Sequence, residues 1–99
     1  MDLMIPLKKK ITVHGHDIEE LTFGEPTGEL VVQLGEPYFH MSGGGFRELP
    51  EVTVNYIVKL CKIPRSSALA LAPGDRKAFF AKLLPFLLPN QGMEEDLDD

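Results

Sequence analysis

The stretch that decides the fold is residues 8–34, KKKITVHGHDIEELTFGEPTGELVVQL. Apolar residues alternate with polar ones before His14-Gly15 and return after it. The two-residue turn of a β-hairpin favours a residue that tolerates positive φ, followed by glycine. The stretch therefore predicts an N-terminal β-hairpin with strands over residues 8–13 and 16–23.

The hairpin is followed by a stop and a helix start. Glu25-Pro26 ends the second strand, because the residue before a proline is held extended and proline cannot donate a ladder hydrogen bond. Thr27 is a typical N-cap residue, and Gly35 occupies the place favoured for glycine after a helix. A short helix is predicted over residues 28–34.

The apolar pattern of the second strand also predicts its pairing. With the turn fixed, Ile11 falls opposite Ile18. Strict alternation then fails at Glu19-Glu20, where two polar residues are adjacent. A β-bulge at this point of the second strand restores the inward parity and brings Leu7 opposite Phe23.

Three further helices are predicted, which makes the fold class α+β. Apolar residues with the 3.6-residue period indicate helices over residues 51–61, 66–71 and 73–88. Residues 36–50 have no regular period, and the glycine-rich segment 42–45 predicts a flexible loop. The apolar residues that flank this loop either fold back onto the core or form an exposed, adhesive surface; they are Tyr38, Phe39, Met41 and Phe46.

The last predicted helix carries two apolar rows. They consist of Phe79, Phe80, Leu83, Leu84, Leu87 and Leu88. Pro85 lies inside these rows and is expected to kink or end the helix, since it cannot donate the bond to Ala81. Two interpretations stay open: both rows pack into the core, or a chain of this size leaves one row for a partner or a second copy.

Length and charge bound the possible functions. A chain of 99 residues predicts one small α+β domain over residues 1–89, with a flexible acidic tail over residues 90–99. The net charge is −5, and the five acids of Glu94–Asp99 supply all of it. A balanced body argues against nucleic-acid binding, and Lys8–Lys10 is interpreted as the solvated part of an edge strand.

Few residues suggest catalytic chemistry. Cys61 is the single cysteine, so a reducing compartment is expected; it is interpreted as a core residue rather than a reactive thiol. His14, His16 and His40 are the candidate ligands of a metal, but residues of a solvated turn are the preferred interpretation. No catalytic residue, cofactor or metal is predicted. The apolar segment 78–89 is too short and interrupted to span a membrane.

Residues 6–30, PLKKKITVHGHDIEELTFGEPTGEL, resemble the opening of tail assembly chaperones from long-tailed bacteriophages and prophages, the group of Mu-like and related small tail proteins. The residues that carry the resemblance are Leu7-Lys8-Lys9, Ile11-Thr12-Val13, Gly15, Leu21-Thr22-Phe23 and Glu25-Pro26-Thr27. Residues 60–64 and 71–75 resemble the family's later helix junctions more loosely. The sequence departs from the family at Lys10, where a proline is common.

The resemblance implies a chaperone that binds the hydrophobic tape measure protein and keeps it soluble while the tail tube polymerises. Such a protein acts in the host bacterial cytoplasm and is not retained in the mature virion. A longer form made by translational frameshifting would add a contact with the tail tube protein. The apolar rows of the last helix are the expected partner-binding residues. The alternative is a small phage-encoded regulatory module that binds a host protein without catalysis.

Overall fold

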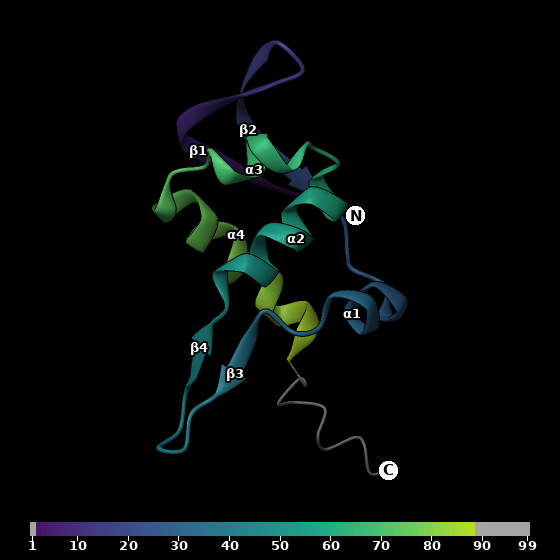
Figure 1. Cartoon of the computed structure of the whole chain (residues 1–99), viewed down its shortest axis with the longest axis vertical. Coiled ribbons are helices and arrows are strands. Elements are labelled where there is room, and N and C mark those ends of the chain that lie inside the picture. The colour runs from purple at the N-terminus through teal and green to yellow at the C-terminus, as the bar shows by residue number, and fades with distance from the viewer. Residues whose placement is uncertain (1, 89–99) are drawn as a thin grey trace.

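Two hairpins and four helices make up residues 2–88, which are those that the computed structural model describes (Figure 1). In chain order the elements are β1 (Leu3–Val13), β2 (His16–Phe23), α1 (Gly28–Leu34), β3 (Tyr38–His40), β4 (Phe46–Glu48), α2 (Pro50–Cys61), α3 (Arg65–Leu69) and α4 (Pro73–Leu87). The predicted α+β fold is confirmed. The predicted acidic tail over residues 90–99 lies outside the described residues.

The turn of the first hairpin has the predicted geometry. His14 and Gly15 both have positive φ, at 51° and 82°, and Val13 pairs with His16 across them. Positive φ at both central residues defines a type I′ turn, whose twist matches that of the two strands it joins. Ile11 stands opposite Ile18, as predicted.

The irregularity of this hairpin lies in β1, so the prediction of a bulge at Glu19-Glu20 of β2 is wrong. The register shifts between Pro6 and Ile11, where residues 7–10 of β1 face only Glu19 of β2. Apolar alternation could not identify the strand with the surplus residues, because an insertion in either strand restores the inward parity of β2.

β1 also begins at Leu3 rather than at residue 8. Leu3 stands opposite Phe23. The predicted pairing of Leu7 with Phe23 is therefore wrong. Ile5 is only 2% exposed and belongs to the core. Its burial explains why the strand continues to the start of the chain, since the inward-facing residues before the bulge cover the same face as those after it.

A carboxylate from the other end of the chain holds the bulge in place. Asp75, the third residue of α4, accepts hydrogen bonds from the backbone N–H of Lys8 at 3.0 and 3.1 Å and from that of Lys9 at 3.2 Å. Asp75 is 2% exposed. Its carboxylate therefore accepts the hydrogen bonds of backbone N–H groups that have no partner in the interrupted ladder. The same hydrogen bonds compensate the carboxylate for its burial.

The predicted caps of α1 are confirmed. The Thr27 hydroxyl oxygen accepts a hydrogen bond from the backbone N–H of Leu30 at 3.1 Å, and Gly35 ends the helix at φ 80°. No residue of α1 is buried. The Tyr56 hydroxyl donates to the carbonyl oxygen of Gly35 at 2.7 Å and so ties the end of this peripheral helix to α2.

The later helices lie close to their predicted ranges. α2 begins at Pro50, one residue early, and α3 covers residues 65–69 instead of 66–71. Pro85 does not end α4, which continues to Leu87, one residue short of its predicted end. A proline near the end of a helix removes only one of the last hydrogen bonds, so the final turn persists.

The predicted loop between α1 and α2 contains a second hairpin. Residues 38–40 pair with residues 46–48, and Gly44 and Gly45 take φ of 99° and 75° in the turn between them. Three-residue strands are too short to show alternation, which is why the sequence pattern missed them. Tyr38, His40 and Phe46 form an aromatic cluster on one face of this hairpin, with ring centroids 5.3–6.1 Å apart.

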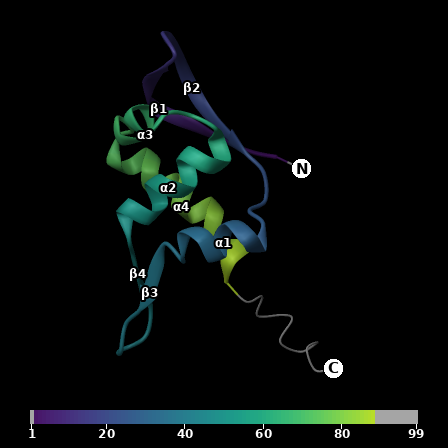
Figure 2. The ribbon, with the colours of Figure 1, turned by 45° about the vertical axis from the view of Figure 1, so that its right-hand side comes forward.

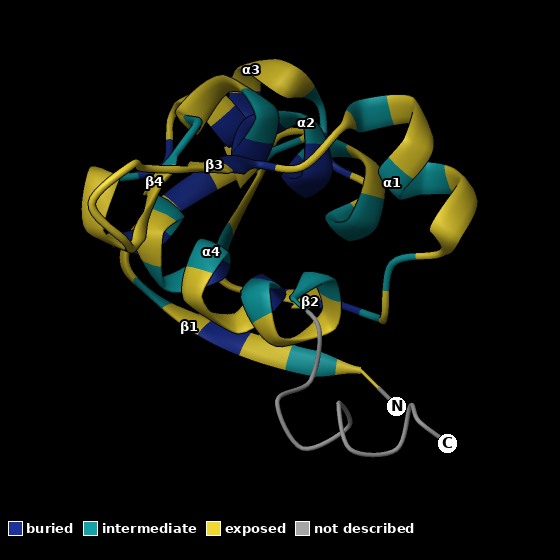
Figure 3. Ribbon diagram, turned by 90° about the horizontal axis from the view of Figure 1, so that it is seen from below, coloured by how far each residue is buried: buried dark blue, intermediate teal, exposed yellow. Residues whose placement is uncertain are grey.

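The core lies between the first hairpin and the helices. Figure 2 shows α2 and α4 below the β1–β2 hairpin, with β3–β4 at the opposite end, and Figure 3 shows buried positions on β1, α2 and α4. The rings of Phe23 and Phe79 meet at its centre, with centroids 4.6 Å apart. The Ser67 hydroxyl donates to the carbonyl oxygen of Thr12 at 2.7 Å and holds α3 against β1.

Replacing Asp75 tests the anchor of the bulge. Asp75→Ala leaves the backbone donors of Lys8 and Lys9 without an acceptor in a part-buried site, so the free energy of unfolding is expected to fall by about 3 kcal/mol. Urea denaturation measures this change. Asp17→Ala, which removes an exposed partner of Lys10, is the control and is expected to cost much less. Equal losses in the two variants would contradict the role of Asp75.

Candidate partner-binding surface

The two apolar rows of α4 have different surroundings. Phe79 and Leu83 are fully buried, with 0% exposure, and Leu87 is half-buried and packs against the core. These three residues are spaced four apart and form the inner row of α4. They cover the apolar side of the first hairpin. Of the two interpretations of the apolar rows, packing into the core is therefore correct for this one.

The other row faces away from the core. Phe80 and Leu84 are half-buried and lie outside the core cluster, and we call this pair the outer row. Phe86, 36% exposed, follows on the last turn of the same helix. Of the five residues predicted to bind a partner, the structure thus leaves two on the accessible side of α4, and their role in binding stays a prediction.

The two rows begin with different charged residues. The inner row continues the line of Asp75, four residues before Phe79, and Asp75 is the buried anchor of the β1 bulge. The outer row continues the line of Arg76, four residues before Phe80. Residues four apart share a helix face. Because Asp75 is buried against β1, the row that follows it at this spacing also faces the core. Asp75 and Arg76 are visible in the sequence, but the sequence does not show which of the two is buried. The hydrogen bonds of Asp75 to β1 show it.

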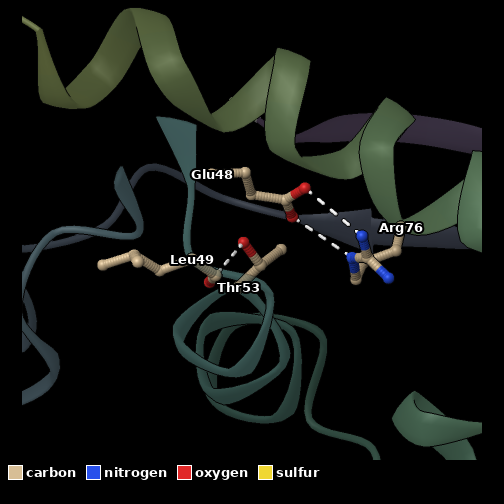
Figure 4. Close-up of polar contacts among 4 residues, drawn as sticks. All are labelled: Glu48, Leu49, Thr53 and Arg76. Carbon is tan, nitrogen blue, oxygen red and sulfur yellow. Dashed lines mark hydrogen bonds and ion pairs between the residues drawn. The ribbon is translucent and has the colours of Figure 1, made fainter. Parts of the chain in front are cut away.

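Arg76 joins α4 to the second hairpin. Its guanidinium donates to both carboxylate oxygens of Glu48, at 3.2 and 3.3 Å (Figure 4). Both side chains are largely shielded from solvent, with 22% and 13% exposure. Nearby, the Thr53 hydroxyl donates to the carbonyl oxygen of Leu49 at the start of α2. A bidentate pair of this kind fixes direction as well as distance, so it orients β4 relative to α4.

The second hairpin adds exposed apolar residues beyond this joint. Phe39, Met41 and Phe46 are 44%, 47% and 38% exposed. The guanidinium of Arg47 lies over the ring of Phe39, 5.9 Å from its centroid. The sequence left open whether the apolar residues around the loop are buried or exposed. Tyr38 is buried, at 6% exposure, whereas Phe39, Met41 and Phe46 are on the surface.

Cys61 has the environment of a core thiol. It is half-buried and packs against the core, and burial raises the pKa of its thiol to about 12. The thiolate is the nucleophilic form of cysteine, and a pKa this high leaves almost none of it near neutral pH. The side chain therefore acts as a small apolar residue.

The candidate metal-ligating histidines do not converge. His14 and His16 are exposed beside the turn of the first hairpin, whereas His40 lies on the second hairpin at the other end of the molecule (Figure 1). Within residues 2–88, no three side chains of the metal-binding types come together to hold an ion. The same part of the chain has no helix long and apolar enough to cross a membrane.

Models of known protein families, curated proteins and solved structures were compared with this chain, and none matches it. The resemblance of residues 6–30 to tail assembly chaperones thus remains a prediction from the sequence. The class that the fold defines is a small α+β protein whose last helix has one buried and one accessible apolar row.

Alanine substitutions distinguish the two rows of α4. Phe79→Ala removes a fully buried ring that contacts Phe23, so it is expected to lower the free energy of unfolding by about 3–5 kcal/mol. Phe80→Ala removes a half-buried ring outside the core and is expected to cost roughly 1 kcal/mol. Urea denaturation of both variants gives the comparison. Similar costs would show that Phe80 also belongs to the core.

The state of Cys61 is tested by its alkylation. A free cysteine, with a pKa of about 8.5, reacts faster as pH rises from 7 to 10, because its thiolate fraction grows and levels off only near the upper end of this range. With its pKa raised to about 12, Cys61 is expected to react far more slowly throughout this range in the folded protein. Iodoacetamide labelling followed by mass spectrometry measures the rate. The same protein in urea provides the free-thiol rate, and a folded-state midpoint near 8.5 would contradict the assignment.

Proposed function

We propose that this protein is a tail assembly chaperone of a bacteriophage or prophage. In this proposal it binds the tape measure protein in the host bacterial cytoplasm, keeps it soluble while the tail tube polymerises, and is not retained in the mature virion. It acts by binding rather than by catalysis. The observation that carries the proposal is the outer row, Phe80 and Leu84, which the fold leaves outside the core. The resemblance of the first hairpin to the family supports it.

The outer row suits a helical partner. Phe80 and Leu84 are one turn apart, and an amphipathic helix binds through apolar residues with the same spacing. A chaperone must let go of the tape measure protein when the tail tube forms around it. Small apolar contacts such as this one are weak enough to be broken at that stage.

The inner row takes a different role in this proposal. Phe79 and Leu83 have no exposed surface, so they act by holding α4 in place and Leu87 does so in part. The acidic run Glu94–Asp99 contributes net charge, which keeps complexes of a protein with its hydrophobic client apart in solution. A frameshifted longer form would bring the tail tube protein to the same complex, and a second copy of the chain is a further candidate for the outer row.

A regulatory module that binds a host protein is the second candidate. Within residues 2–88, β1–β2 and β3–β4 are both two-stranded sheets. Each strand therefore has one edge that is not paired with another strand, and a segment of a partner could add to it. The exposed Phe39 and Met41 lie on or beside such an edge. Gene neighbourhood separates the two functions, because a tail chaperone is expected between the genes for the tail tube and tape measure proteins.

Charged residues in the outer row test the chaperone proposal. The double variant Phe80→Asp, Leu84→Asp is expected to leave the tape measure protein insoluble on co-expression, because carboxylates cannot be buried against an apolar partner. Soluble and pelleted tape measure protein are quantified by gel. Lys82→Asp changes the net charge by the same amount at an exposed position on the opposite side of the same helix, and it is expected to preserve solubility.

The result depends on the variants being folded, which circular dichroism and urea denaturation establish for each. If the folded outer-row variant keeps the tape measure protein as soluble as the unchanged chain does, the proposed binding surface is wrong. Loss of solubility in both variants would show that the effect is one of charge on α4 and not of the apolar row.

A further inference from the structure

The bulge in β1 contains three consecutive exposed lysines. In a regular strand, Lys9 would point to the face opposite Lys8 and Lys10, because successive side chains alternate. Here residues 7–10 face only Glu19, and all three lysines are exposed. We call this exposed run, Lys8–Lys10, the lysine bulge.

The backbone of the lysine bulge is fixed. The Asp75 carboxylate, 2% exposed, holds the N–H groups of Lys8 and Lys9 at 3.0–3.2 Å. Only the side chains are left to move, so ordering a ligand on them costs less entropy than on a free loop. Among residues 2–88, the structure pairs one of the three lysines with an acid: Lys10 lies 3.4 Å from Asp17.

A depression of about 280 Å³ adjoins the bulge. Its lining includes Lys9 and Lys10 together with Ser66, and also Thr12, whose hydroxyl already donates to Asp17. Ammonium and hydroxyl groups both donate hydrogen bonds to carboxylate oxygens. The surface thus suits an acidic polypeptide segment.

We propose that the lysine bulge binds the acidic run Glu94–Asp99 of the same chain. Residues 2–88 contain ten acids and ten bases, so the five acids of this run are the unbalanced charge of the molecule. A ligand on the same chain has a local concentration in the millimolar range, which compensates for the weakness of single exposed ion pairs. This inference is independent of the proposed chaperone function.

The distances allow the contact. Asp75 touches the bulge and begins the part of α4 that ends at Leu87, about 18 Å further along the helix axis. The residues from Leu87 to Glu94 span up to about 23 Å when extended. The chain beyond α4 is therefore long enough to return along the helix and place the acidic run beside the lysines.

Paramagnetic broadening in the full-length protein tests the contact. A nitroxide is attached to Met93→Cys in a Cys61→Ser background, next to the acidic run but without removing a charge. At an ionic strength of roughly 0.01 M we expect broadened amide signals for Lys8–Lys10, and loss of the broadening at about 1 M, where charges are screened within a few ångströms. Broadening that is absent at low salt, or that persists at high salt, would overturn the proposal.

Two lysine variants make the test specific. Replacing Lys8, Lys9 and Lys10 by Gln is expected to abolish the broadening at the bulge, whereas replacing Lys59 and Lys62 by Gln, two exposed lysines at the end of α2, is expected to preserve it. The reverse pattern would place the acidic run elsewhere. A mixture of spin-labelled chain and isotope-labelled chain without nitroxide must show no broadening, since broadening there would assign the contact to a second copy.

Discussion

The hydrogen bonds between Asp75 and the backbone of Lys8 and Lys9 are the constraint on which the other parts of the structure depend. They satisfy the donors that the bulge removes from the ladder, and they fix the rotation of α4 about its axis. Once Asp75 faces β1, the residues four and eight positions later, Phe79 and Leu83, must face the core as well. One buried carboxylate thereby holds the bulge of the hairpin in place and orients the last helix.

Local interactions explain what could be predicted from the sequence. The type I′ turn at His14-Gly15 and the caps at Thr27 and Gly35 involve only groups a few residues apart, so their residue types identify them. Each failure involves a distant partner. Sequence pattern could not place the bulge in β1, because that depends on Asp75. It could not separate the two rows of α4 for the same reason.

The second hairpin was missed for a related reason. Its strands are too short to show alternation, and the ion pair that joins it to the body is made with Arg76, 28 residues after Glu48. Arg76 also begins the line of α4 that leads to the outer row. The accessible side of α4 and the exposed hairpin are thus held together by one ion pair, and a body of this size has too little core to bury either of them.

The separation of Asp75 from Lys8 along the chain has a consequence for synthesis. The two residues are 67 positions apart, so the contact closes a loop that includes most of the body. A ribosome working at about 5–20 residues per second needs roughly 3–10 s to pass from the end of β2 to Asp75. During this interval the apolar face of the first hairpin, with Ile5 and Phe23, lacks the helix that covers it. The nascent chain is itself prone to aggregation until its last helix is made.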